Sequence, residues 1–166
     1  MKFRAEHEFP GSVLAVADIL CDPGFHTRLD LPDLSRPEVV EHTVVDSKRT
    51  LRLRYEFIGH LDPIARRLLA GRRLTWMQEL QLDTATGAGR LSFAAEAEAD
   101  RLYGEATVML TALAEQRTRR TVAGNLFVKV PLVGGTAEKR IVPGLVARLD
   151  VEAAALTAAL IAAAGT

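Results

Sequence analysis

Apolar and polar side chains alternate along seven stretches of this chain. In the first stretch, residues 2–9, the side chains of Phe3, Ala5, His7 and Phe9 share one face, and charged residues occupy the other. A period of two residues is typical of a half-buried β-strand. The same alternation predicts further strands at residues 38–46, 49–58, 73–83, 89–99, 102–114 and 117–130.

The connections between these strands are short. Ser47 and Lys48 join the second strand to the third, and residues 84–88 and 100–101 join later pairs. Strands joined in this way pair antiparallel. Their inward faces are expected to carry Leu51, Leu53, Tyr55 and Phe57; Leu74, Trp76, Gln78, Leu80 and Leu82; Leu91, Phe93, Ala95 and Ala97; Gly104, Ala106, Val108 and Leu110; and Val122, Gly124, Leu126 and Val128.

Helical periodicity replaces alternation elsewhere. Ser12 can cap a helix at residues 13–20, and residues 24–31 are expected to form a second short helix or turn. Asp62 is the expected cap of a third short helix within residues 61–71. A long C-terminal helix is predicted by apolar residues that recur at helical spacing among alanines, namely Val142, Leu145, Leu149, Leu156 and Leu160.

Polar residues and a proline predict which side of this last helix faces solvent and where it is interrupted. Arg148, Asp150 and Glu152 are expected to mark its solvent-facing side. Pro143, followed by Gly144, predicts a kink or a restart of the helix, because proline lacks the backbone N–H that a helix interior uses.

A glycine pair, Gly134-Gly135, precedes the helix. Such a pair can cradle a phosphate, but a P-loop also needs a Lys-Ser or Lys-Thr that this segment lacks. The pair is therefore predicted to turn the last strand into the helix. Thr136 is the expected cap, and Glu138 suits the positive end of the helix dipole.

The order of elements is strand, two short helices, six strands and a long helix. An antiparallel sheet of about seven strands must bury its apolar face against that helix. The predicted class is therefore α+β, with a curved sheet wrapped around the C-terminal helix and a cavity between them. No linker or repeat divides the chain, so residues 1–166 are predicted to form a single domain.

These residues resemble a known family. The order of elements resembles the helix-grip fold of the START, polyketide-cyclase and birch-pollen-allergen superfamily, also called SRPBCC. Within it, the opening MKFRAEHEFPGSVLAVADILCDPGF and the stretch VPLVGGTAEK, residues 130–139, resemble an uncharacterised bacterial domain-of-unknown-function family that is common in actinobacteria. The resemblance covers nearly the whole chain and implies a START-like helix-grip domain.

Composition narrows the range of partners. Lys+Arg and Asp+Glu both number 21, and this zero net charge disfavours nucleic acid as a partner. The weakly polar run at the C-terminal end is too short and too rich in alanine for stable membrane insertion. One cysteine, Cys21, and a start without an apolar signal segment predict a cytoplasmic protein.

A pocket is predicted from the large residues on inward faces. Its expected walls are the aromatic residues Tyr55, Trp76 and Phe93, with Gln78 and His7 as polar groups and Leu145 and Leu149 as the lid from the helix. Plain core packing would use the same residues, and for His7 a hydrogen-bonded core histidine is the favoured interpretation.

Other chemistry finds little support. No histidine pair has the spacing of metal ligands, so neither a metal nor a cofactor is expected. Cys21 is expected to be a small buried residue. The arginine clusters at residues 66–73 and 117–120 are expected to be solvated, and Glu96 and Glu98 to face water rather than form a catalytic pair.

Three functions follow from these predictions. The favoured one is a module that binds a hydrophobic small molecule, lipid-like or aromatic, between sheet and helix. The alternative is an enzyme of the polyketide cyclase or aromatase kind, in which His7 and Gln78 are the groups to test. The third is a packed interaction domain without a ligand, in which an exposed apolar patch matters more than a pocket. No catalytic residue and no oligomeric state is assigned.

Overall fold

The computed structural model describes residues 1–61, 63, 66 and 69–165. The cap Asp62 and part of the predicted short helix within residues 61–71 fall outside the described residues. The elements that position the candidate site all lie within them.

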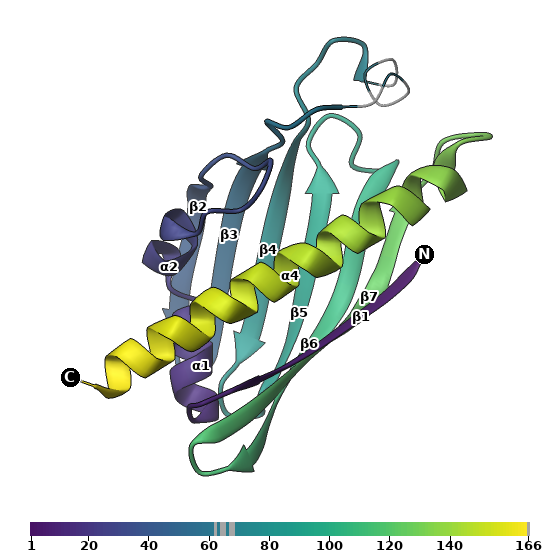
Figure 1. Cartoon of the computed structure of the whole chain (residues 1–166). Helices are drawn as coiled ribbons and strands as arrows, with labels where there is room; N and C mark the ends of the chain where they lie inside the picture. The colour runs from purple at the N-terminus through teal and green to yellow at the C-terminus, as the bar shows by residue number, and fades with distance from the viewer. Residues whose placement is uncertain (62, 64–65, 67–68, 166) are drawn as a thin grey trace.

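One seven-stranded sheet forms the body of the described structure, in the order β1-β7-β6-β5-β4-β3-β2 (Figure 1). All neighbouring strands pair antiparallel, as the short connections predict. The strands are β1 (Lys2–Phe9), β2 (Glu38–Val45), β3 (Lys48–Glu56), β4 (Thr75–Asp83), β5 (Ala88–Ala95), β6 (Leu102–Ala114) and β7 (Arg117–Val128).

The register of the sheet places the predicted inward residues opposite one another. Tyr55 faces Trp76, and Phe93 lies between Gln78 and Gly104 on the neighbouring strands. Directly opposed residues share a face, so these side chains gather on the inner side. Ala97 is a wrong prediction, because β5 ends at Ala95 and Ala97 is exposed in the following turn.

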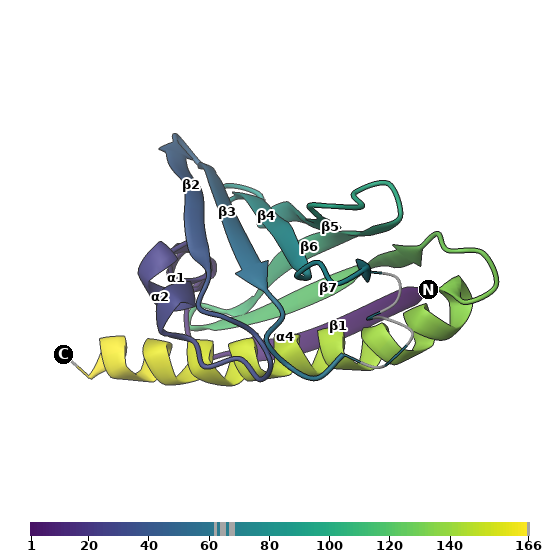
Figure 2. The same cartoon turned by 90° about the horizontal axis from the view of Figure 1, so that it is seen from above.

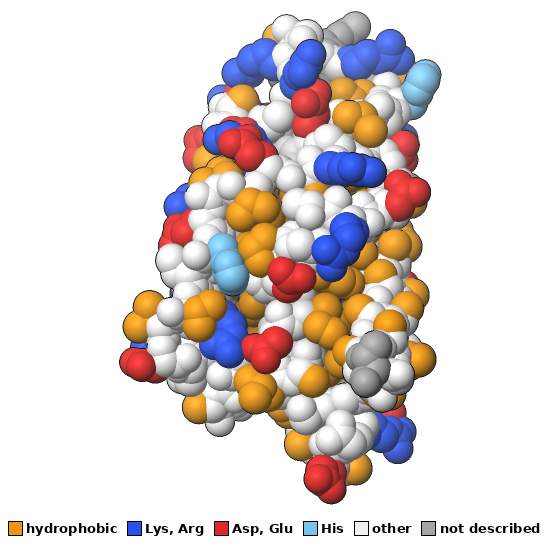
Figure 3. All heavy atoms as spheres, turned by 90° about the vertical axis from the view of Figure 1, so that its left-hand side faces the viewer, with side chains coloured by type: hydrophobic (Ala, Val, Ile, Leu, Met, Phe, Trp, Pro, Cys, Tyr) orange, Lys and Arg blue, Asp and Glu red, His pale blue; other side chains and the backbone are white. Residues whose placement is uncertain are grey.

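β2 departs from the half-buried strand that alternation predicts. It lies at the edge of the sheet and is exposed along nearly its whole length. The exposed fractions are 40% for Val39, 41% for Val40, 52% for Val44 and 63% for Val45. Figure 3 views the molecule from the side on which β2 and α2 lie and shows apolar side chains among charged ones on this face.

Two short helices follow β1. α1 (Val13–Leu20) is capped by Ser12, whose hydroxyl accepts a hydrogen bond from the backbone N–H of Ala15 at 3.2 Å, as predicted. α2 (Pro23–Arg28) is shorter than expected and is capped by the carboxylate of Asp22. Val16 and Ala17 of α1 are fully buried.

α4 (Gly134–Ala164) runs across one face of the sheet from the end of β7 to α1 (Figures 1 and 2). It begins two residues before Thr136, and its first turn has no side-chain cap, so the predicted role of Thr136 is wrong. The predicted restart at Pro143 is also wrong, because the helix continues through that residue. The lost N–H bond is tolerated in a helix held along its length by packing.

The glycine pair lies in the first turn of α4, and residues 129–133 connect β7 to the helix, so the pair is not itself the predicted turn. A Cβ atom on Gly134 would lie 2.1 Å from the carbonyl oxygen of Val128, so only glycine allows this close approach. Glu138 accepts a hydrogen bond at 3.0 Å from the backbone N–H of Val128 and ties the helix to the strand.

The outer face of α4 is apolar rather than charged in its second half. Ala154 and Ala158 are exposed there, with Val151 and Ile161. Glu152, predicted to face solvent, is buried with an exposed fraction of 7%. Arg148 also turns towards the sheet, and of the three predicted solvent-facing residues only Asp150 is exposed. Two polar residues of this helix, Arg148 and Glu152, therefore face the sheet and belong to the candidate site.

Candidate ligand site between the sheet and the long helix

A small hollow lies between the inner face of the sheet and α4. Its volume is about 30 Å³, which is room for about two water-sized atoms. Its lining is Leu20, His26, Gln78, Leu80, Leu91, Phe93, Val108, Arg120, Val122, Leu145, Arg148, Leu149 and Glu152. Small-molecule pockets typically measure a few hundred cubic ångströms, and this hollow is far smaller because large side chains fill most of the space under the helix.

Four of the seven predicted pocket residues border this hollow. Gln78 and Phe93 approach from the sheet, and Leu145 and Leu149 from the helix. The ring of Phe93 lies over Gly104, where a Cβ atom would be only 2.0 Å from it. Gly104 thus lets the ring lie flat against the sheet, so that Phe93 forms a wall of the hollow. The role of these residues in binding stays a prediction.

Tyr55 and Trp76 lie beside the hollow rather than in its lining. Their rings stack with centroids 5.8 Å apart and planes inclined by 19°. Tyr55 is fully buried, and burial raises the pKa of its phenol. Its hydroxyl has no hydrogen bond of normal geometry.

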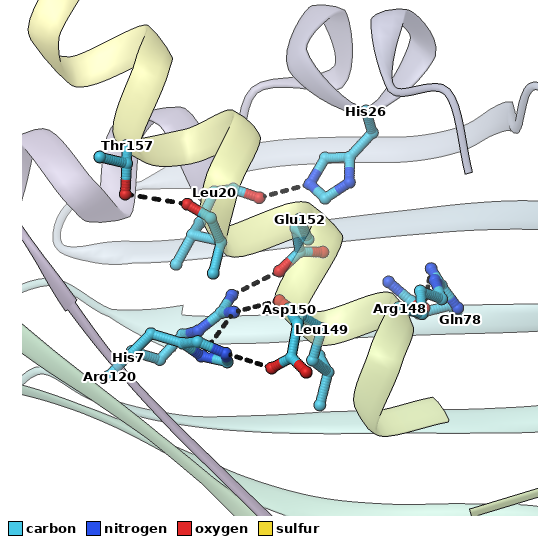
Figure 4. Close-up of polar contacts among 11 residues, drawn as sticks. His7, Leu20, His26, Gln78, Arg120, Arg148, Leu149, Asp150, Glu152 and Thr157 are labelled. Atoms are coloured by element: carbon cyan, nitrogen blue, oxygen red, sulfur yellow. Dashed lines mark hydrogen bonds and ion pairs between the residues drawn. The ribbon is translucent and has the colours of Figure 1, made fainter. Parts of the chain in front are cut away.

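A buried ion pair closes one side of the hollow. Arg120 of β7, with an exposed fraction of 2%, pairs through Nη1 with Oε1 of Glu152, and its Nη2 donates to the carbonyl of Leu149 at 3.2 Å (Figure 4). The prediction that Arg120 belongs to a solvated arginine cluster is wrong. A buried guanidinium needs such partners, since an unpaired buried charge is costly.

The sequence held a signal for both members of this pair. Arg120 lies two residues before the inward Val122, so it shares that face of β7. Glu152 lies three residues after Leu149 and four before Leu156, on the buried stripe of α4. The prediction placed both side chains in solvent because they are charged. Their positions on the inward faces of strand and helix instead determine that they are buried.

The electrostatics of Glu152 follow from its neighbours. Burial alone raises the pKa of this carboxyl, but the positive charges around it, Arg120 foremost and Arg148 as well, outweigh burial and hold the pKa below its usual range. Glu152 therefore stays ionised and keeps Arg120 in place.

His7 lies on the other side of Arg120 from the hollow and does not line it. Arg120 Nη2 contacts His7 Nδ1 at 3.2 Å, and His7 Nε2 lies 2.8 Å from Oδ1 of Asp150. A guanidinium only donates and a carboxylate only accepts, so the neutral ring carries its proton on Nε2. His7 is thus a hydrogen-bonded histidine of the core margin, which is the interpretation that the sequence favours.

His26 was not predicted as a site residue, yet it borders the hollow with an exposed fraction of 2%. Its Nε2 lies 2.7 Å from the carbonyl oxygen of Leu20, so Nε2 carries the proton and donates. Its Nδ1 is buried without a hydrogen-bond partner, as is Nε of Arg120. Almost every buried polar atom in a native protein has a partner, and here two exceptions belong to residues that line one hollow.

Arg148 is a second guanidinium at the hollow. It donates from Nη2 to Oε1 of Gln78 at 2.7 Å, and its Cζ lies 4.4 Å from the centroid of the Tyr55 ring. Figure 4 shows Arg148 and Gln78 meeting between α4 and the sheet. Within the described part of the chain, the direct contacts of its guanidinium are thus with an amide and an aromatic ring, neither of which carries a negative charge.

The remaining titratable groups give no other site. Cys21 is buried as predicted, and burial raises the pKa of its thiol to about 12, which leaves it unreactive at neutral pH. Among the described residues no cluster of His, Cys, Asp or Glu has the geometry of a metal site. No helix within the described part of the chain is long and apolar enough to cross a membrane.

Solved structures share this architecture at low sequence identity. The chain is similar to Zhui aromatase/cyclase from a Streptomyces species, with 16% identity, a TM-score of 0.56, and coverage of 99% of this chain and 94% of that one. It is similar to norcoclaurine synthase from Thalictrum flavum in complex with dopamine and hydroxybenzaldehyde, with 15% identity, a TM-score of 0.63, and coverage of 97% and 86%.

A START superfamily protein from Mycobacterium smegmatis is also similar, with 14% identity, a TM-score of 0.58, and coverage of 96% of each chain. These likenesses confirm the helix-grip fold of the START and polyketide-cyclase superfamily. No curated protein sequence matches the chain. Residues 4–160 match the family described as "Protein of unknown function (DUF2505)". The chain belongs to that family.

Proposed function

We propose that this protein binds a hydrophobic small molecule, lipid-like or aromatic, between the curved sheet and α4. The observation that carries the proposal is the hollow itself, where apolar walls meet buried polar atoms that lack partners. Small-molecule sites typically combine mostly apolar walls with a few polar groups that fix the orientation of the ligand. The START-like fold and the ligand-bearing synthase of similar fold support the same function.

Binding requires the hollow to enlarge, because a volume of about 30 Å³ holds no such ligand. Phe93 and Leu145 border it and are both only half-buried. Their outward movement enlarges the space without breaking the Arg120–Glu152 pair. Apolar burial drives the ligand in, and the polar groups set its orientation.

The test is native mass spectrometry of the freshly purified protein, with extraction and identification of any released molecule. Leu145→Trp fills the hollow from α4, and Val151→Trp makes the same change on the outer face of that helix. A stoichiometric apolar adduct that Val151→Trp keeps and Leu145→Trp loses supports the proposal. An adduct kept by both variants places the ligand elsewhere, and failure to bind any apolar probe rejects the proposal.

The position of His7 disfavours the enzyme alternative, because this side chain contacts Asp150 and Arg120 and does not line the hollow. The interaction alternative gains a specific observation, the exposed valines of β2. Sedimentation analysis decides between a monomer and an assembly, and an assembly dispersed by Val44→Lys supports this second function.

The proposal keeps the cytoplasm as the location, since the one cysteine is a free buried thiol.

A further inference from the structure

The polar end of the hollow carries an excess of positive charge. Two guanidinium groups, Arg120 and Arg148, and one carboxylate, Glu152, are in its lining, which leaves one positive charge. Glu152 is paired with Arg120. Arg148 is near enough to lower the pKa of Glu152 but forms no ion pair with a carboxylate of the described residues, so the excess positive charge lies on its side of the hollow.

The free hydrogen-bonding groups at the hollow are mostly donors. Arg120 Nε is a buried N–H without an acceptor. Arg148 uses one N–H on Gln78 and stacks on Tyr55, and stacking leaves the in-plane N–H groups of a guanidinium available. The buried hydroxyl of Tyr55, on the ring beside the hollow over which Arg148 lies, can also donate. His26 Nδ1 is the acceptor among them, because Nε2 carries the proton.

From this arrangement we infer that the ligand carries an anionic oxygen group, a carboxylate, which Arg148 receives at the polar end of the hollow. The inference rests on the proposed function and names the class of its ligand. A hollow with room for about two water-sized atoms suits the two oxygens of a carboxylate, and the apolar part of the ligand lies along Phe93 and Leu145. Gln78 holds the guanidinium in position from the sheet.

The test compares matched probes that differ only in the charged group. Dodecanoate is compared with dodecanol, and 2-naphthoate with 2-naphthalenemethanol, each below its micelle concentration and at pH 7.5. The fluorescence of Trp76 reports binding, because it is the one tryptophan of the chain and stacks on Tyr55 beneath Arg148. We expect the acid of the pair that binds to be bound at least tenfold more tightly than its alcohol.

Variants then assign the preference to Arg148. Arg148→Gln should remove the preference for the acid and keep the affinity for the alcohol, which also shows that the variant is folded. Arg148→Lys should keep part of it, since lysine retains the charge without the planar fork. Arg90→Gln, a charge change at an exposed residue of β5, should leave it unchanged.

The outcomes separate the two proposals. Equal affinity for acid and alcohol in the native protein overturns the carboxylate inference and leaves the proposed function standing. A full preference for the acid in Arg148→Gln also overturns the inference, because the charge then acts from elsewhere. Binding of neither pair of probes rejects the proposed function, and the inference with it.

Discussion

The two halves of α4 pack against the rest of the protein in different ways. In the second half, Leu156 and Leu160 are buried with exposed fractions of 0% and 5%. Gly11 lies so close that a Cβ atom there would be 2.9 Å from Leu160 Cδ2. In the first half, Leu145 is half-buried and Arg148 reaches the sheet through Gln78. Small residues allow close contact in one half, and long polar side chains bridge a wider space in the other.

This difference separates a half of the helix that contributes to stability from a half that covers the hollow. The second half holds α4 against α1 and β1 by dense apolar packing. That attachment lets the first half cover polar groups and a hollow that contribute little to stability. The pair of Arg120 and Glu152 lies at the boundary. Substitutions that act on one half or on the boundary can test this division.

The largest effect is expected at the boundary. Arg120→Ala leaves Glu152 buried and unpaired, and the free energy of unfolding should fall by about 3–5 kcal/mol in urea denaturation. Arg119→Ala is the matched control, since Arg119 pairs with Glu8 at the surface, and it should cost about 1 kcal/mol or less. The double variant Arg120→Met with Glu152→Met should recover much of the loss. Equal losses for Arg119→Ala and Arg120→Ala would contradict the assigned role of the pair.

The next effect compares the two halves directly. Leu156→Ala opens a cavity in the dense half and should lower the free energy of unfolding by about 2–5 kcal/mol. Leu145→Ala removes a half-buried side chain beside an existing hollow and should cost less than half as much. Urea denaturation of both variants measures the difference. Equal costs would show that the two halves pack alike.

A smaller effect is expected from pH. The folded-state pKa of Glu152 lies below its ordinary value of 4.5. The stabilisation from its charge is therefore complete above about pH 4.5 and is lost as pH falls through the folded value. Thermal unfolding from pH 7 to pH 3 should show a shallower loss for Glu152→Gln than for the native chain. Parallel curves would show that Glu152 does not carry this dependence.

The smallest effect is expected at the exposed end of the same network. Asp150 pairs with His7, but its side chain is 61% exposed. Solvent and salt screen such a contact, so Asp150→Ala should lower the free energy of unfolding by about 1 kcal/mol or less. The same urea titration, repeated at high salt, measures it. A loss as large as that of Arg120→Ala would mean that the network acts as one unit.

Much of the fold is predictable from residue positions alone. Alternation assigns the inward residues of β1, β3, β4 and β6, and short connections assign the antiparallel order. Four predicted pocket residues, Gln78, Phe93, Leu145 and Leu149, border the hollow. The errors have physical causes: β2 lies at a sheet edge and is exposed along nearly its whole length, and Pro143 is tolerated because packing holds the helix.

The sequence by itself determined which residues share a face, because the periods of strand and helix are local properties of the backbone. The tertiary structure alone decided which faces meet. Arg120 and Glu152 are 32 residues apart, and their pairing depends on how α4 crosses β7. The size of the hollow was decided in the same way, because it is the small space left after the side chains of sheet and helix have packed.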